Sequence, residues 1–163
     1  MPFDIKGFKP RYGNIKQGFY NPTNKEKYIG DKEVIIYRSS WELKFLMFCD
    51  RSARVVRYSS EPIGIPYYNT MDHKIHKYYI DFYVEMQNEN DVMKWLIEVK
   101  PIKFIQMPKR PKLETLKTLE RYTKEVKRYM INHMKFDAAK NYAKENGMTF
   151  GIVTENFVMQ KMM

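Results

Sequence analysis

The sequence predicts a single mixed α/β domain in which helices cover one β-sheet. Two observations support this prediction. The expected elements follow the order helix, strands, helices, strand, and the spacing of apolar residues changes between helical and alternating along that order. The length of 163 residues also fits one domain.

The first 33 residues show no helical or strand period and are rich in Gly, Pro, Asn and Lys. We expect residues 1–33 to form an arm, residues 34–158 the domain, and residues 159–163 a C-terminal tail. The aromatic residues of the arm indicate that it docks on a surface. Residues 34–37 are apolar and predict a short strand.

A capping box opens the first predicted helix. Ser39 and Glu42 fit the S-x-x-E pattern, and an apolar stripe follows as far as Cys49. Strands are expected over 55–58, 63–68 and 78–86, and the last of these alternates clearly in YYIDFYVEM. A polar turn then leads to a strand over 93–100, so the last two strands are predicted to form an antiparallel hairpin.

Two helices and one strand complete the prediction. A Lys- and Pro-rich link follows the hairpin, and apolar residues three or four apart then predict a long helix over 113–133. A second helix is expected over 136–146, ended by Gly147 as its C-terminal cap. The final strand is expected over 148–153.

Composition argues against several classes of protein. The chain has one cysteine, Cys49, which permits neither an intramolecular disulfide nor a cysteine-based zinc site. No apolar run approaches the roughly 20 residues of a membrane span, and the N-terminus does not read as a signal peptide. We therefore expect an intracellular soluble protein without membrane contact. No Walker or Rossmann motif points to a small-molecule cofactor.

The charge is strongly basic and unevenly distributed. The formal net charge is +10, and residues 100–135 contain eleven Lys or Arg but only three Glu. The middle of the chain is close to neutral and rich in acidic residues. A solvated basic surface is one interpretation, and a polyanionic partner such as nucleic acid is the other. The distribution fits an acidic centre inside a basic cradle.

Parity along the predicted hairpin directs three charged side chains to one face. Residues two apart in a strand share a face, so Glu98 and Lys100 point the same way, and Asp81 joins them if the strands are in register. Two carboxylates offer oxygen ligands for Mg²⁺ or Mn²⁺, and a lysine beside them can act on a metal-bound water. The alternative is a charged outer face with cross-strand ion pairs.

Glu42 has two possible roles. As part of the capping box it needs no catalytic explanation, but at the start of a helix it can also present a third carboxylate to a metal. The two roles are compatible. The tripeptide E-x-K also occurs at 42–44 and 125–127, so the copy at 98–100 is distinguished by its place at the end of an apolar strand.

The order of these residues resembles the PD-(D/E)xK nuclease superfamily, with Ile80 where the superfamily's Pro lies. The stretches KYIGDKEVIIYRSSWE, SSEPIGIPY, YYIDFYVEM, WLIEVKP and FGIVTE further resemble the head completion nucleases of tailed phages. The same motif order is similar to the catalytic domain of the transposon endonuclease TnsA.

This resemblance implies a restriction-endonuclease-like fold and a Mg²⁺-dependent deoxyribonuclease that acts on packaged phage DNA before tail joining. It implies a place in the virion or the host cytoplasm, with portal or neck proteins as partners. Glu42, Asp81, Glu98 and the Val99 backbone carbonyl would bind Mg²⁺, for which Mn²⁺ would substitute, and Lys100 would serve the attacking water. The alternatives are a non-catalytic virion neck protein that binds DNA ends, and a transposon-end endonuclease that works with a transposase.

Basic residues around this centre are candidates for contact with DNA phosphates, which give affinity without sequence readout. They are His76, Lys77, Lys103, Lys109, Arg110, Lys112, Lys117, Arg121, Lys135 and Lys140. Two further features are open. His73 and His76 lack the additional ligands that zinc would need, and Glu61 is either a turn residue or a neighbour of the site.

Overall fold

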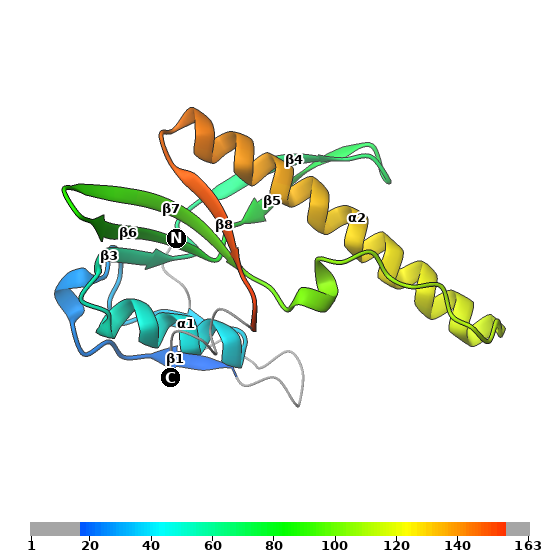
Figure 1. Ribbon diagram of the computed structural model, residues 1–163, viewed down its shortest axis with the longest axis horizontal. Helices are drawn as coiled ribbons and strands as arrows, with labels where there is room; N and C mark the ends of the chain where they lie inside the picture. Colours follow the sequence, from blue (N-terminus) through cyan, green and yellow to red (C-terminus); the bar gives the residue numbers. More distant parts are fainter. Residues whose placement is uncertain (1–16, 156–163) are drawn as a thin grey trace.

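The computed structural model describes residues 17–155, and its centre is a four-stranded sheet (Figure 1). The strand order is β3-β6-β7-β8, formed by β3 (Val55–Ser60), β6 (Phe82–Asn88), β7 (Asp91–Val99) and β8 (Thr149–Val153). Strand β6 is antiparallel to both β3 and β7, whereas β8 runs parallel to β7. The sheet is therefore mixed, and the predicted fold class is confirmed.

The two helices, α1 (Ser40–Arg51) and α2 (Leu116–Glu145), pack against opposite faces of this sheet. Alternation along β7 explains how one strand serves both layers, because Ile97 joins the core around α1 and Leu96 joins the core around α2. The side chain of Glu98 shares the face of Leu96. The charged end of β7 consequently opens on the α2 side of the sheet.

Helix α1 begins where the capping box predicts. Ser39 is the N-cap residue, and its side-chain oxygen accepts a hydrogen bond of 3.1 Å from the Glu42 backbone N–H. The helix ends at Arg51, as expected from the sequence. Its inner face packs into the core through three buried residues, Phe45, Leu46 and Cys49.

The predicted strand over 78–86 is wrong as one element. Its first residues belong to β5 (Lys74–Tyr79), which pairs with β4 (Gly64–Asn69) in a separate two-stranded ribbon. The chain then breaks at 80–81 and enters β6 in the central sheet. The alternation continues through the break, so the sequence pattern does not reveal that the strand changes partners. This break leaves Asp81 at the start of β6.

The two helices predicted over 113–133 and 136–146 are also wrong, because α2 is one helix of 30 residues. No Gly or Pro interrupts the span from Leu116 to Glu145, so nothing in the backbone chemistry ends the helix there. The connection from β7 runs through the short helix η3 (Ile102–Phe104) and α2 to the parallel strand β8. At 1.5 Å per residue the helix is about 45 Å long, and its first turns project beyond the sheet (Figure 1).

The described part of the predicted arm packs on the domain. Strand β1 (Gly18–Tyr20) pairs with β2 (Ile35–Tyr37), and η2 (Lys25–Lys27) leads to Tyr28, which lies in the core at 7% exposure. This non-local pairing has no periodic signal in the sequence. Residues 1–16 of the arm and the predicted tail over 159–163 lie outside the described residues.

A buried carboxylate ties this segment to the end of α1. Asp50 is fully buried and accepts hydrogen bonds from the Tyr20 hydroxyl at 2.7 Å and from the backbone N–H groups of Thr23 and Asn24 at 2.8 Å each. Burial raises the pKa of Asp50, but these hydrogen bonds outweigh burial and hold the pKa below its usual range. No helix of the described residues is both long and apolar enough to cross a bilayer.

We predict that Asp50→Asn lowers the free energy of unfolding by about 2 kcal/mol, because an amide NH₂ would replace an acceptor that faces several donors. Urea unfolding measures the effect. Since the folded-state pKa of Asp50 is depressed, the advantage of the wild type is full above the ordinary Asp pKa and shrinks as the pH falls below it. The control is Asp72→Asn, at an exposed residue. An equal loss of stability in both variants would contradict the proposed role of Asp50 in fixing this segment to α1.

Candidate active site

Three charged residues meet where β6 begins and β7 ends. The pairing of Phe82 with Ile97 places the preceding residue, Asp81, opposite Glu98. The Val99 backbone N–H donates a hydrogen bond of 2.8 Å to Asp81 Oδ2. Lys100 Nζ lies 2.8 Å from Glu98 Oε1. The structure therefore brings Asp81, Glu98 and Lys100 together on one face.

Glu98 is held on both sides by protein groups. Its residue is only 3% exposed, so an unpaired charge there would be costly. Lys100 neutralises Oε1, and the Tyr78 hydroxyl donates a hydrogen bond to Oε2. Tyr78 comes from β5 and was not identified from the sequence. Its only signal was its position three residues before Asp81.

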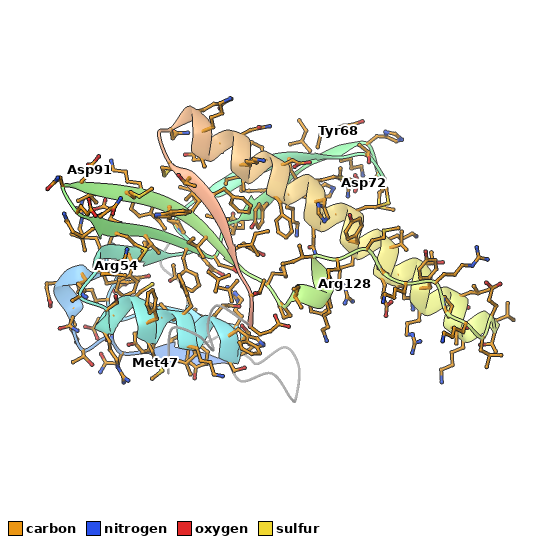
Figure 2. All side chains as sticks on the ribbon, in the orientation of Figure 1. Met47, Arg54, Tyr68, Asp72, Asp91 and Arg128 are labelled. Carbon is orange, nitrogen blue, oxygen red and sulfur yellow. The ribbon has the colours of Figure 1, made fainter. Side chains whose placement is uncertain are left out.

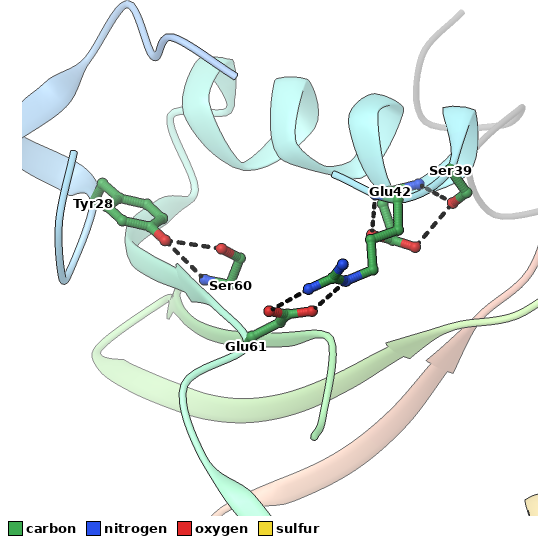
Figure 3. A network of polar contacts seen from close by, with 6 residues as sticks. Tyr28, Ser39, Glu42, Ser60 and Glu61 are labelled. Carbon is green, nitrogen blue, oxygen red and sulfur yellow. Dashed lines mark hydrogen bonds and ion pairs between the residues drawn. The ribbon is translucent and has the colours of Figure 1, made fainter. Parts of the chain in front are cut away.

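Glu42 lies in the first turn of α1. Its Oε2 accepts a hydrogen bond of 2.9 Å from the Arg38 backbone N–H, and its Oε1 accepts one of 3.0 Å from the Ser39 hydroxyl (Figure 3). The carboxylate thus binds the backbone of the residue before the N-cap, and not the Ser39 backbone N–H that a capping box uses. Glu42 also acts on the site, because its negative charge contributes to the raised pKa of Asp81.

The site carries an excess of negative charge. Burial raises the pKa of Asp81 well above its usual range, and the charges of Glu98 and Glu42 raise it further. Burial also raises the pKa of Glu42. For Lys100 burial lowers the pKa, but the nearby carboxylates, Glu98 foremost, outweigh burial and raise it. Lys100 therefore stays protonated as the cation of the site.

Lys135 is the predicted DNA contact that α2 brings closest to these carboxylates. Its Nζ lies 5.5 Å from the ring centroid of Tyr78 and 5.8 Å from that of Tyr67, which fits cation–π contact. Burial lowers its pKa, and the charge of Lys100 lowers it further, while Glu98 opposes the shift. Lys135 thus stands in the electrostatic reach of Lys100 and Glu98.

The ribbon and η3 hold three more of the predicted DNA contacts in local interactions. His76 lies 2.7 Å from the Asp72 carboxylate and stacks on Tyr67. Lys77 is exposed on β5, opposite Pro66. Lys103 Nζ lies 4.8 Å from the centroid of Phe104, whose ring is also contacted by the guanidinium of Arg128 on α2 (labelled in Figure 2).

The other predicted DNA contacts follow α2 and its leading segment instead of surrounding the carboxylates. Lys117 lies 18 residues before Lys135, which is about 27 Å along the helix axis. The expected basic cradle is therefore a strip that extends away from the site. Lys140 is exposed further along the same helix. This basic strip, near or on the projecting turns, consists of Lys109, Arg110, Lys112, Lys117 and Arg121.

The donor chemistry fits a hard divalent cation. Asp81 Oδ1 accepts no hydrogen bond within residues 17–155, and the like charges around Asp81 would be offset by a cation. Over the same residues no three His, Cys, Asp or Glu side chains are grouped so that they could hold a metal as they stand. Glu42 and Glu98 each have both oxygens engaged by protein donors. Each carboxylate oxygen keeps a second lone pair, so these side chains can still bind a metal if they turn toward Asp81.

A further ion pair lies next to the carboxylates. The sequence pointed to Glu61 but not to its pairing with Arg38. The guanidinium of Arg38 donates to the Glu61 carboxylate at 2.8 and 3.2 Å, and Figure 3 shows Glu61 facing the start of α1. The Glu61 backbone N–H donates to the Asp81 carbonyl at 2.9 Å. Glu61 therefore lies beside the site, which was one of the two positions expected for it.

Two comparisons show which known proteins the chain is similar to. Residues 52–155 match the family described as TnsA-like endonuclease N terminal. The head completion nuclease of Enterobacteria phage T4 is 32% identical over 139 residues, which cover 85% of this chain and 91% of that protein. Asp81, Glu98 and Lys100 all lie in the matched range of the family, whereas Glu42 precedes it.

We predict that Asp81→Asn stabilises the metal-free protein by about 1 kcal/mol, because it removes a charge that burial and two neighbouring carboxylates disfavour. The Asn oxygen can still accept the hydrogen bond from Val99. Because the folded-state pKa of Asp81 is raised, the difference disappears once the pH falls low enough to protonate the wild-type side chain. Urea unfolding in EDTA measures this, with the exposed Asp91→Asn as control. Destabilisation by Asp81→Asn would contradict the charge argument.

Proposed function

The chain belongs to the TnsA-like endonuclease family and is similar to the head completion nuclease of phage T4, and we propose that it hydrolyses DNA phosphodiester bonds with a bound divalent metal. The observation that carries this proposal is the meeting of Asp81, Glu98 and Lys100 where β6 begins and β7 ends. Lys100 Nζ lies 2.8 Å from Glu98 Oε1, and Asp81 Oδ2 accepts a hydrogen bond of 2.8 Å from the backbone N–H of Val99, which lies between them in the chain. A nuclease needs such a group of carboxylates and a cation around a phosphate.

Asp81 and Glu98 would hold Mg²⁺, with the Val99 backbone carbonyl and Glu42 as further ligands. Mn²⁺ would substitute, because it shares the preference for oxygen ligands. When bound, the metal supplies an activated water and offsets the charge of the phosphate. A metal on Glu98 would compete with Lys100 for Oε1 and leave the ammonium available to turn toward substrate.

Lys100 would orient the attacking water and stabilise the negative charge that develops on the phosphate. The raised pKa of Lys100, which the surrounding carboxylates cause against the effect of burial, favours the protonated form. A protonated lysine donates hydrogen bonds but does not accept a proton. We therefore propose an electrostatic and orienting role for Lys100.

The basic strip would hold the DNA on one side of the cut. It is formed by the segment before α2 and by the projecting first turns of that helix, from Lys109 to Arg121. The distance of about 27 Å from Lys117 to Lys135 corresponds to roughly eight base pairs, at 3.4 Å per step. Contacts of this kind bind phosphates irrespective of sequence, which suits a nuclease that acts on DNA of any sequence.

The substrate that we propose is packaged phage DNA, cut during head completion before tail joining. The likeness to the T4 head completion nuclease supports this setting. Portal or neck proteins would then be the partners, and the virion or host cytoplasm the place of action.

We predict that the purified wild type nicks or linearises supercoiled plasmid with Mg²⁺ or Mn²⁺ but not with EDTA. Glu98→Gln should lower the rate by at least about a hundredfold, because it removes a ligand charge at the reacting centre. The matched control is Glu125→Gln, since Glu125 belongs to another E-V-K tripeptide but lies exposed on α2. Lys100→Ala should behave like Glu98→Gln.

Two results would contradict this assignment. Full cleavage by Glu98→Gln would place the reacting centre elsewhere. A wild type that binds DNA in a salt-dependent manner yet cleaves under no metal would favour the alternative of a non-catalytic DNA-binding protein.

Metal binding has its own test, which does not depend on cleavage. A ligand that binds only the folded state stabilises it, by about 2.7 kcal/mol at a hundredfold excess over the dissociation constant. We expect added Mg²⁺ to raise the melting temperature of the wild type and of Asp91→Asn. Asp81→Asn should show little or no rise, and equal rises in all three proteins would rule out Asp81 as a ligand.

A further inference from the structure

Arg38 and Glu61 bridge two parts of the candidate active site that are distant in the sequence. Through its backbone N–H, Arg38 hydrogen-bonds the Glu42 carboxylate, and through its backbone N–H, Glu61 hydrogen-bonds the carbonyl of Asp81. Their side chains then close the gap as a two-contact ion pair between guanidinium and carboxylate (Figure 3). A movement of this pair would therefore act on the hydrogen bonds to both Glu42 and Asp81.

Glu61 adopts a backbone conformation that is uncommon for its residue type. Its φ angle is +44°, in the left-handed region that favours glycine, and Pro62 follows it. Residues held in such conformations gather at binding sites and switch regions, where surrounding contacts keep them in place. Here the contacts are the hydrogen bond to Asp81 and the two bonds to Arg38.

The guanidinium is accessible from outside. Arg38 and Glu61 line a groove of about 850 Å³, whose walls also include Ser59, Pro62 and Tyr79. Their side chains are 40% and 32% exposed, so the ion pair is not sealed in the core. A ligand in this groove can reach the pair without disturbing the central sheet.

The geometry of the pair matches the way arginine binds phosphate. A planar guanidinium donates two parallel hydrogen bonds to carboxylates and phosphates alike, so one can replace the other. We propose that Arg38 binds a phosphate of the DNA strand next to the scissile bond, and that Glu61 occupies this position until DNA arrives. Release of Glu61 would also allow its backbone to leave the left-handed region.

This inference rests on the proposed function, since it concerns the same DNA substrate. It makes opposite predictions for the two partners of one ion pair. Loss of Arg38 removes a phosphate contact and should weaken DNA binding, whereas loss of the Glu61 charge removes a competitor and should strengthen binding. A structural ion pair away from the DNA would change the affinity only through the net charge, and therefore by little in either direction.

The test measures the affinity of the full chain for a fluorescein-labelled DNA duplex by anisotropy in EDTA, over a series of salt concentrations. We expect Arg38→Gln to weaken binding about threefold to tenfold and to reduce the salt slope by about one. Glu61→Gln should tighten binding about threefold, because a neutral amide competes less well with phosphate for the guanidinium. Arg38→Lys keeps the charge without the fork and should fall between wild type and Arg38→Gln.

The matched control is the ion pair of Arg57 and Glu85, which also has two contacts, of 3.0 Å each, but lies on β3 and β6 away from Asp81. Arg57→Gln and Glu85→Gln make the same charge changes and should move the affinity much less than Arg38→Gln and Glu61→Gln do. Melting temperatures of all variants identify any that fail to fold, and Glu61→Gln with Arg38→Lys then decides the matter. Weaker binding by Glu61→Gln, or no change in either Arg38 variant, would overturn the proposal.

The cleavage assay separates this proposal from the proposed function. If the wild type cleaves plasmid but the Arg38 variants bind DNA normally, only the exchange of Glu61 for phosphate is wrong. If the wild type does not cleave, the proposed function fails, while opposite affinity changes would still support a phosphate site at Arg38.

Discussion

The hydrogen bond from the Val99 N–H to the Asp81 carboxylate is the contact on which the geometry of the site depends. The ladder between β6 and β7 ends at Phe82 and Ile97, so the next backbone donor on β7 needs another acceptor. Asp81 supplies it. On the other side Val99 pairs with Val153 of β8, and the Lys100 N–H donates to the Val153 carbonyl. With Val99 fixed from both sides, its neighbours Glu98 and Lys100 are directed to the same face.

This arrangement gathers more negative charge than its local cations neutralise. Glu42, Glu61, Asp81 and Glu98 lie around the site, and Arg38 and Lys100 pair directly with Glu61 and Glu98. Burial and the charges of Glu98 and Glu42 raise the pKa of Asp81 against the smaller opposing effects of the Val99 hydrogen bond and of Lys100. Sites that bind a cation or a transition state are commonly disfavoured in the empty protein. The charge imbalance is thus a property expected of a site and not of a structural ion-pair network.

The sequence predicts those parts of the fold that depend on local chemistry. The cap at Ser39, the end of α1 and the shared parity of Glu98 and Lys100 all follow from rules that involve a few neighbouring residues. The change of partner strand at 80–81 does not follow from such rules. The alternation in YYIDFYVEM would look the same if the whole segment paired with one strand or if its two halves paired with different strands. The contribution of Tyr78 to the site depends on the same exchange and could not be read from the pattern.

Because α2 is one continuous helix, it fixes the position of basic residues relative to the site. Two shorter helices would have left Lys117 and Arg121 on a separate element that could move relative to the site. One unbroken helix instead joins these two residues rigidly to Lys135, which stands beside Tyr78 and within the field of Glu98. Asn132 and His133 donate to or contact the carbonyls of Phe104 and Ile105, so the segment after β7 is fixed to the same helix. DNA held by the projecting turns would therefore be held at a set distance from the carboxylates, and that distance is determined by the helix and not by a flexible link.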